Sequence, residues 1–400
     1  MTSHNSVAII GSGVIGLSVG ISLLKMSPAL RVTIYEKEPG LGYHASGRNS
    51  GVIHAGFYYS PETLKAKFCR EGNEALVELI KNNDLSLRRT GKVVVTKNHS
   101  ELPGLLELHK RGSENGVKLE LLESEQLKNF EPLARSVDAF LWSPNTAVAS
   151  PAEVISVLAR EFEDLGGTLL FKQDVEHIGE KFLTLHKCKV PVDLTINCAG
   201  TQAIKFAHEM GVGLDLAQLP FIGLYRFTEH KNLPLRTLVY PLPDKKFPFL
   251  GVHFTISIDG KTKVGPTAIP VMGGEQYKIF EGVTVRDLFQ TAQSVKALTT
   301  KNFGQTLRLA AMEFPNLNTK NLLSKAEDLV PSTASKLTWE KYKPGIRAQL
   351  VETNTGDFLQ DFRIAKTHSV LHVLNSVSPG WTSSIPFGRW LATESLELLG

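Results

Sequence analysis

Residues 7–36 constrain the fold more than any other stretch of this chain. Four apolar residues at 7–10 precede the pattern Gly-Ser-Gly-Val-Ile-Gly at 11–16, and a helix-like run is followed by a second apolar segment that ends at Glu36. This order predicts a buried strand, a tight turn, and a helix whose N-terminal amides face a pyrophosphate. An acid at the end of the second strand accepts hydrogen bonds from an adenosine ribose and repels a ribose phosphate, which favours FAD or NAD over NADP. A glycine pattern alone also occurs in ordinary turns, but here the strands, helix and acid agree.

The composition indicates a folded protein without extended charged tracts. The 400 residues are 42% hydrophobic and 21% charged, and a chain of this length usually forms two domains or one large discontinuous one. The net charge of +4 comes from dispersed Lys and Arg, so we expect no nucleic-acid partner. Cys69, Cys188 and Cys198 are odd in number and lack metal-ligand spacing, so we expect reduced thiols, a cytoplasmic location and no metal centre. Glycines interrupt the apolar run at 7–24, which argues against a membrane span or a signal sequence there.

Residues 37–59 are rich in glycine, serine and asparagine and directly follow the acid at position 36. This composition predicts a long structured loop, and long loops of this kind are usually functional. The loop contains Gly-Arg-Asn-Ser-Gly-Val-Ile-His-Ala-Gly-Phe-Tyr-Tyr at 47–59, and Ser-Pro-Glu-Thr-Leu-Lys-Ala-Lys-Phe-Cys follows at 60–69. These segments resemble the L-2-hydroxyglutarate dehydrogenase/oxidase family, which belongs to the FAD-dependent oxidoreductases that include D-amino-acid oxidase.

The resemblance extends over nearly the whole chain. Other similar segments are Cys-Ala-Gly at 198–200, Tyr-Pro-Leu-Pro-Asp at 240–244, residues 247–255, residues 264–268, and Gly-Ile-Arg-Ala-Gln at 345–349. The match implies FAD rather than NAD. The residues expected to contact FAD are Gly11, Gly13, Val14, Ile15, Gly16, Glu36, Lys37, Ser46, Asn49, Ser50, Val175, Ala199, Gly200, Gly380, Thr382, Ser383 and Ser384.

We therefore predict an α/β fold with a discontinuous, Rossmann-like FAD-binding domain and an α+β substrate domain built on a mostly antiparallel sheet. The segments 1–85, 150–215 and 340–400 are assigned to the FAD-binding domain. The segments 86–149 and 216–339 are assigned to the substrate domain, whose strands are punctuated by Pro and Gly. The amphipathic spacing of residues 280–335 predicts helices on the outer side of the substrate domain.

The resemblance implies oxidation of L-2-hydroxyglutarate to 2-oxoglutarate by hydride transfer from the substrate's alpha carbon to flavin N5. This chemistry needs a base for the hydroxyl proton and cations that fix the anionic substrate. His54 is the first candidate for the base and His253 the second, because a neutral imidazole has a suitable proton affinity near pH 7. Arg347 is the expected carboxylate clamp, since a guanidinium binds a carboxylate in a bidentate manner. Tyr58 or Tyr240 is expected to donate a hydrogen bond to the substrate.

Some positions depart from the family pattern. Ile222 and Leu224 stand where the family usually has an arginine and a polar residue, while Gly380 and Trp381 replace two alanines. These departures leave open a related flavoenzyme that acts on another small 2-hydroxy acid, an amino acid or glycerol-3-phosphate. A flavin-binding module without catalysis is a further alternative, although the intact segment around His54 argues against it. The family also suggests a quinone or oxygen as the electron acceptor, and peripheral contact with the inner face of the membrane.

Overall fold

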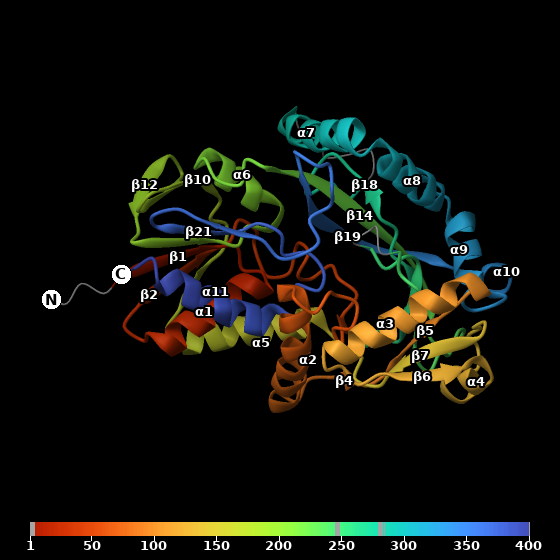
Figure 1. The fold of residues 1–400 in the computed structure, drawn as a ribbon. Helices are drawn as coiled ribbons and strands as arrows, with labels where there is room; N and C mark the ends of the chain where they lie inside the picture. The colour runs from red at the N-terminus through yellow and green to blue at the C-terminus, as the bar shows by residue number, and fades with distance from the viewer. Residues whose placement is uncertain (1–4, 245–248, 279–282, 284, 400) are drawn as a thin grey trace.

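The structure is a computed structural model that describes residues 5–244, 249–278, 283 and 285–399. Its first sheet has six strands in the order β20-β21-β13-β1-β2-β9 (Figure 1). The strands are β1 (Ser6–Ile10), β2 (Arg31–Tyr35), β9 (Thr168–Leu170), β13 (Leu194–Asn197), β20 (Ile364–Lys366) and β21 (Val370–Val373). All neighbours pair in parallel except β20, which runs antiparallel to β21. Three separated parts of the chain therefore build one sheet.

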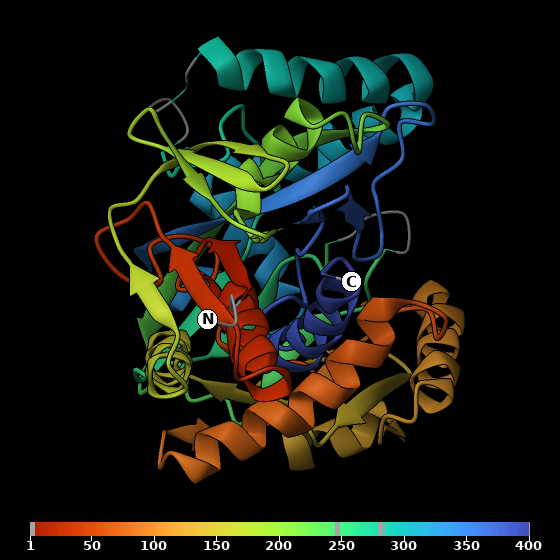
Figure 2. The same cartoon turned by 90° about the vertical axis from the view of Figure 1, so that its left-hand side faces the viewer.

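Apolar side chains bury both faces of this sheet. Ile9 of β1 lies between Ile34 of β2 and Ile196 of β13, and all three are fully buried, as expected for central parallel strands. The helices that share the core of one face are α1 (Val14–Met26), α2 (Leu64–Asn82), α5 (Pro151–Asp164) and α11 (Ser384–Leu396). Helices α1 and α11 lie side by side, red and dark blue in Figure 2, because glycine at position 388 allows close approach to Ser18. The other face is covered by α6 (Ala203–Glu209) and by a small sheet of β10 (Val175–Gly179), β11 (Phe182–Leu185) and β12 (Cys188–Pro191).

The second sheet has nine strands and is almost entirely antiparallel. Its order is β18-β14-β17-β16-β15-β5-β7-β6, and β19 also pairs with β14. The only parallel pair among its described strands is β5 with β15. The strands are β5 (Lys92–Val95), β6 (Glu120–Glu123), β7 (Ala139–Ser143), β14 (Leu216–Glu229), β15 (Leu238–Pro241), β16 (His253–Ile256), β17 (Lys261–Gly265), β18 (Ile269–Pro270) and β19 (Glu340–Glu352).

Further elements connect and cover the two sheets. A short sheet of β3 (Val52–Ile53), β8 (Ala147–Ala149) and β4 (Leu87–Arg88) joins the loop after the first sheet to the second part of the molecule. The helices around the second sheet are α3 (Leu102–Glu114), α4 (Leu127–Phe130), α7 (Val285–Lys301), α8 (Phe303–Glu313), α9 (Thr319–Glu327) and α10 (Thr333–Lys336). Figure 1 shows α7 and α8 outside β14 and β19, where they share a core with Phe221 and Val351.

The predicted α/β class and the mostly antiparallel second sheet are confirmed. The predicted segment boundary at residue 340 would group β19 with the first sheet. Instead, β19 pairs with β14 in the second sheet, from Leu216 opposite Glu352 to Phe227 opposite Glu340. The division into domains otherwise stays a prediction. Residues 247–248, 280–282 and 284, which belong to predicted segments, lie outside the described residues.

Candidate active site

A cleft formed by two adjoining cavities lies where the parallel strands end. The two cavities share Gly13, Ala45, Ser46, Cys198, Gly200, Thr201 and Ile346 in their walls. The first cavity is lined by Gly11, Glu36 and Cys198, which directly follow β1, β2 and β13. Ligands of open parallel sheets bind at this edge. The second cavity continues past Asn49 and His54 to Arg347 and Trp381.

The turn between β1 and α1 requires glycine at two positions. Gly11 has φ +98°, and a Cβ on it would lie 2.7 Å from the Cys198 carbonyl oxygen. A Cβ on Gly16 would lie 2.1 Å from the Gly11 carbonyl oxygen. Helix α1 has Gly13 as its N-cap and no acid in its first turn, and the Val14 amide donates to Ser46 Oγ at 3.1 Å. The helix therefore presents amides and its positive dipole end to the cavity, as anion-binding sites do.

Three donors fix the carboxylate of Glu36 at the end of β2. Oε2 accepts from the Ser12 amide at 2.9 Å and from Ser12 Oγ at 2.8 Å, and Oε1 accepts from the Glu38 amide at 2.9 Å. A carboxylate has about four lone-pair positions, so one remains for a ligand hydroxyl. The side chain also lines the first cavity, and its predicted contact with the ribose of FAD stays a prediction.

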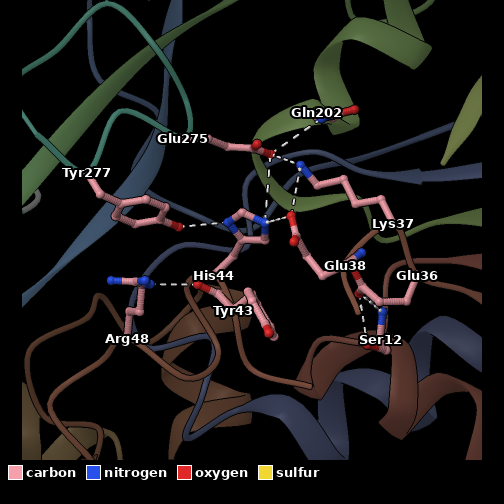
Figure 3. Close-up of polar contacts among 10 residues, drawn as sticks. All are labelled: Ser12, Glu36, Lys37, Glu38, Tyr43, His44, Arg48, Gln202, Glu275 and Tyr277. Atoms are coloured by element: carbon pink, nitrogen blue, oxygen red, sulfur yellow. Dashed lines mark hydrogen bonds and ion pairs between the residues drawn. The ribbon is translucent and has the colours of Figure 1, made fainter. Parts of the chain in front are cut away.

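A polar cluster joins the loop after β2 to the segment after β18 across the first cavity (Figure 3). His44 Nδ1 contacts Tyr277 Oη at 2.8 Å, and His44 Nε2 contacts Glu38 Oε1 at 2.9 Å. Lys37 donates to Glu275, and its Nζ lies 3.6 Å from Glu38 Oε1. Burial would raise the pKa of the Glu275 carboxyl, but the hydrogen bond and charge of Lys37 outweigh it and lower the pKa. The cluster thus ties together two segments that are distant in the chain.

The same cluster contains the ligand types of a metal site. Within the described ranges, Glu38, His44 and Glu275 place one ligand atom each within 4.8 Å of one another. The Lys37 ammonium already approaches both carboxylates. Since an ammonium group repels a second cation, we assign no metal to these residues.

His54 and Arg347, two of the predicted catalytic residues, line the second cavity. The His54 amide donates to Thr382 Oγ1 at 3.1 Å, and its carbonyl accepts from Asn73 Nδ2 at 3.0 Å, so the backbone is held on both sides. His54 Nδ1 is buried and has no hydrogen-bond partner among the described residues. Burial, followed by the charge of Lys92, lowers the pKa of His54 well below its usual value, which leaves the imidazole neutral. Arg347 donates from Nη1 to the Thr267 carbonyl at 3.2 Å.

Tyr58, Tyr240 and His253 do not line either cavity, although the sequence predicts all three as catalytic candidates. They are buried in the core of the second sheet, which is why the cavity walls exclude them. The His253 ring stacks on Tyr240 with centroids 3.7 Å apart, and its Nδ1 donates to the Gly251 carbonyl at 2.8 Å. Burial lowers the pKa of His253 to about 3. Tyr225, which the sequence did not single out, lies on the wall of the second cavity.

Lys92 is a second residue that sequence reasoning missed. It begins β5, is 0% exposed, and has no hydrogen-bond partner for Nζ among the described residues. Burial lowers the pKa of Lys92 to about 7. The signal in the sequence is a lysine directly before the three valines at 93–95, because lysine is rarely buried without a partner.

Comparison with known proteins identifies the family. Residues 6–394 match the model of the family described as DAO, FAD dependent oxidoreductase. The chain belongs to this family. It is therefore an FAD-dependent oxidoreductase. Among the residues that the structure describes, no helix has both the length and the apolar character needed to cross a bilayer.

Several curated relatives of this FAD-dependent oxidoreductase cover nearly all of it. L-2-hydroxyglutarate dehydrogenase of Indibacter alkaliphilus is 33% identical over 98% of both chains. The human mitochondrial L-2-hydroxyglutarate dehydrogenase is 31% identical over 98% of this chain and 89% of its own. The fold resembles FAD-bound L-alpha-glycerophosphate oxidase of Mycoplasma pneumoniae, with a TM-score of 0.71 at 22% identity over 100% of this chain and 95% of that one. The fold also resembles glycine oxidase of Geobacillus kaustophilus, with a TM-score of 0.72 at 18% identity over 98% of this chain and 95% of that one.

The residues present fit FAD along most of the cleft. The glycine turn would be blocked by any Cβ at positions 11 or 16, and the amides of α1 suit a pyrophosphate. The expected contacts that line the two cavities are Gly11, Gly13, Val14, Ile15, Gly16, Glu36, Lys37, Ser46, Asn49, Ser50, Val175, Ala199, Gly200, Gly380 and Thr382. Ser383 and Ser384 are expected contacts that the structure does not place on these walls. Both are 0% exposed, because α2 packs closely here and a Cβ on Gly72 would lie 2.9 Å from the Ser383 Cα.

The departures from the family pattern fall partly outside the cleft. Ile222 is buried together with Ile269 and Ile346, and Leu224 packs against this group. Neither Ile222 nor Leu224 lines the two cavities of the cleft. Trp381 does line the second cavity, and its Nε1 has no partner among the described residues. Burial raises the pKa of Cys198 to about 12, which keeps its thiol protonated and unsuited to nucleophilic attack.

Proposed function

We propose that this enzyme oxidises L-2-hydroxyglutarate to 2-oxoglutarate. The observation that carries the proposal is a neutral imidazole, with no partner for its Nδ1 among the described residues, on the wall of the same cavity as an arginine. His54 and Arg347 both line the second cavity, and none of its lining residues is Asp or Glu. A base beside a cation, without a competing carboxylate, suits an anionic 2-hydroxy acid. The 31–33% identity to L-2-hydroxyglutarate dehydrogenases over 98% of the chain supports this substrate over others.

In the proposed reaction the substrate loses its hydroxyl proton and the hydrogen on its alpha carbon together with that bond's electron pair. FAD, when bound, supplies the hydride acceptor at its N5 atom. His54 takes the hydroxyl proton, because its lowered pKa leaves a nitrogen lone pair free near neutral pH. Arg347 has five N–H donors and uses one on the Thr267 carbonyl, so the others can bind a substrate carboxylate. The oxygen then forms the carbonyl of the 2-oxo acid.

The cofactor contacts in this proposal follow the cleft. The amides at the start of α1 and Gly11 would hold the pyrophosphate, and Glu36 the adenosine ribose. Ser46, Asn49 and Ser50, on the wall of the second cavity, would approach the flavin ring.

Anaerobic absorbance spectroscopy tests the substrate. The purified, FAD-loaded enzyme is mixed with L-2-hydroxyglutarate, its D enantiomer, glycerol-3-phosphate and several amino acids, and flavin bleaching is recorded. We expect bleaching by the L enantiomer and none by the D enantiomer. If another compound bleaches the flavin and L-2-hydroxyglutarate does not, the proposed substrate is wrong and that compound takes its place. Absence of bleaching by all of them, with FAD bound, would favour a flavoprotein without catalysis.

We also propose peripheral contact with an anionic membrane surface and a membrane quinone as the electron acceptor, with oxygen as the alternative. Exposed apolar side chains on consecutive helices support membrane contact. On α7, α8 and the short 3-10 helix Phe314–Leu317 they are Leu288, Val295, Phe303, Leu307, Phe314 and Leu317. Phe303 is 63% exposed and Leu307 59%, and the exposed Lys296 and Lys301 lie nearby in sequence. Surfaces that combine exposed apolar and basic side chains bind anionic membranes.

Vesicle sedimentation tests this contact. The enzyme should sediment with vesicles containing anionic phospholipids, and the Phe303→Ser/Leu307→Ser variant should remain in the supernatant with its FAD bound. Equal sedimentation of both proteins would contradict the proposal. Self-association through these exposed apolar side chains would instead change the sedimentation velocity in the absence of lipid. Rates of oxygen uptake and of quinone reduction, measured on the same preparation, distinguish the two acceptors.

A further inference from the structure

The ammonium group of Lys92 is enclosed by aromatic rings. Its Nζ lies 4.5 Å from the ring centroids of Phe57 and Tyr58 and 4.8 Å from that of Tyr240. Aromatic faces attract cations without supplying a negative charge or taking up a proton. The group is therefore held in place while it lacks a hydrogen-bond partner among the described residues.

Among the described residues, the surroundings of Lys92 offer hydrogen-bond donors but no Asp or Glu. The Tyr58 hydroxyl is also buried without a partner in the described part of the chain. Several titratable groups interact with Lys92 or with its neighbours. They are His54, Tyr58 and Tyr59 of the 54–59 segment, Cys69 of α2, Tyr225 of β14, Tyr240 of β15, His253 of β16 and Arg347 of β19. None of them is Asp or Glu. A buried cation next to an unpaired hydroxyl donor is complementary to an anion.

We propose that Lys92 and Tyr58 form a subsite for the distal carboxylate of a dicarboxylic 2-hydroxy acid. This inference rests on the proposed function, in which Arg347 and His54 hold the end of the substrate that reacts. His54 lines the cavity, and Tyr58 follows it by four residues on the same segment. Neither Tyr58 nor Lys92 lines the cavity, so a substrate that extends past His54 brings its second carboxylate to the Tyr58 hydroxyl and the charge of Lys92 only by displacing side chains behind the wall at His54. The subsite would select a dianion over a monocarboxylate of equal length.

The proposed pairing makes binding take up a proton. Burial lowers the pKa of Lys92 to about 7, so at pH 8 most of the free enzyme carries a neutral amine there. An adjacent carboxylate favours the ammonium form and raises this pKa, so binding at pH 8 should take up about one proton. The lowered pKa of His54 and of His253 leaves both neutral at pH 8, while burial keeps Cys69 protonated with a pKa of about 12. Affinity should therefore weaken as the pH rises above 7.

Calorimetry of the holoenzyme measures this uptake directly. The oxidised enzyme is titrated with 2-oxoglutarate at pH 8 in two buffers that differ in ionisation enthalpy, and the difference in heat gives the number of protons. We expect about one proton for the native enzyme and for Lys263→Met, and none for Lys92→Met. Lys263 is a suitable control because it is a second buried lysine of the same sheet, 4% exposed and 4.1 Å from the Tyr342 ring centroid.

A substrate analogue without the distal carboxylate provides an independent test. L-2-Hydroxyvalerate keeps the chain length of L-2-hydroxyglutarate but lacks the distal carboxylate. Lys92→Met should lower kcat/KM for flavin reduction by L-2-hydroxyglutarate about 100-fold, as expected for loss of a charged hydrogen-bond partner, and change that for L-2-hydroxyvalerate less than about threefold. Tyr58→Phe should act in the same direction with a smaller effect.

Each outcome separates the subsite from the proposed function. Binding of 2-oxoglutarate with the same affinity and proton uptake in Lys92→Met would overturn the subsite and leave the proposed function intact. If 2-oxoglutarate does not bind but glycerol-3-phosphate binds with uptake that depends on Lys92, the proposed substrate is wrong and the anion subsite stands. If no dianion binds with Lys92-dependent uptake, the subsite is wrong.

Discussion

Replacing Lys92 by methionine should stabilise the protein, although it removes a residue that we place in the substrate site. The pKa of Lys92 falls from 10.5 to about 7 on folding. A lysine whose folded-state pKa is lowered costs stability at every pH below its unfolded value. The cost is complete below pH 7 and disappears as the pH rises toward 10.5, because the unfolded chain binds more protons in that window. At 1.36 kcal/mol per pKa unit, this corresponds to about 4 kcal/mol at pH 7 and about 2 kcal/mol at pH 9.

Thermal unfolding at two pH values measures this effect. Methionine keeps most of the volume of the lysine stem, so a new cavity should contribute little. For a chain of 400 residues, about 4 kcal/mol corresponds to a rise in Tm of about 5 °C at pH 7, and the rise should be about half as large at pH 9. FAD must be present at the same saturating concentration in all samples, because cofactor binding also raises Tm. Substitution of the exposed Lys118 by methionine is the control and should change stability by less than about 0.5 kcal/mol. A Tm that falls at pH 7, or rises equally at both pH values, would refute the reasoning.

Three further substitutions test the cleft. Gly16→Ala places a Cβ 2.1 Å from a backbone carbonyl oxygen and should abolish FAD retention, which is seen as loss of flavin absorbance after purification. Gly304→Ala is the control and should retain FAD, because nothing lies within 4 Å of a Cβ there. Equal flavin content in both variants would contradict the account of the turn. His54→Asn should slow flavin reduction about 100-fold or more at unchanged FAD content, and stopped-flow rates close to those of the native enzyme would remove His54 as the base. Tyr277→Phe removes the 2.8 Å contact to His44 and should speed FAD release severalfold, measured by the return of flavin fluorescence after dilution; an unchanged release rate would show that the cluster does not retain the cofactor.

Local sequence was sufficient to predict the first sheet and its cofactor turn. The continuous apolar run of β1 is followed at once by a glycine turn, which favours a strand buried on both faces. The glycines at 11 and 16 are needed in this turn because a Cβ at either position would collide with the backbone. The β14–β19 pairing was harder, because it joins residues more than a hundred positions apart, and the sequence of β19 does not show which sheet it joins. The rings around Lys92 also come from distant positions, 57, 58 and 240. Sequence spacing carries no information about such convergence.

The charged groups on and behind the walls of the cleft differ in how they are paired, and this difference separates structural groups from those proposed to bind the substrate. Lys37, Glu38, His44 and Glu275 are paired with one another, so they hold two chain segments together and have little charge left for a ligand. Arg347 instead donates to a backbone carbonyl, and Lys92 is held by rings. Neither arrangement neutralises the cation. A carboxylate beside either group would stabilise the empty protein more strongly, but it would also compete with an anionic substrate. The unpaired ammonium group of Lys92 lowers the stability of the empty protein, and pairing with the substrate recovers this free energy. Removing the group should therefore make the protein more stable and its binding of the dianion weaker, both for the same physical reason.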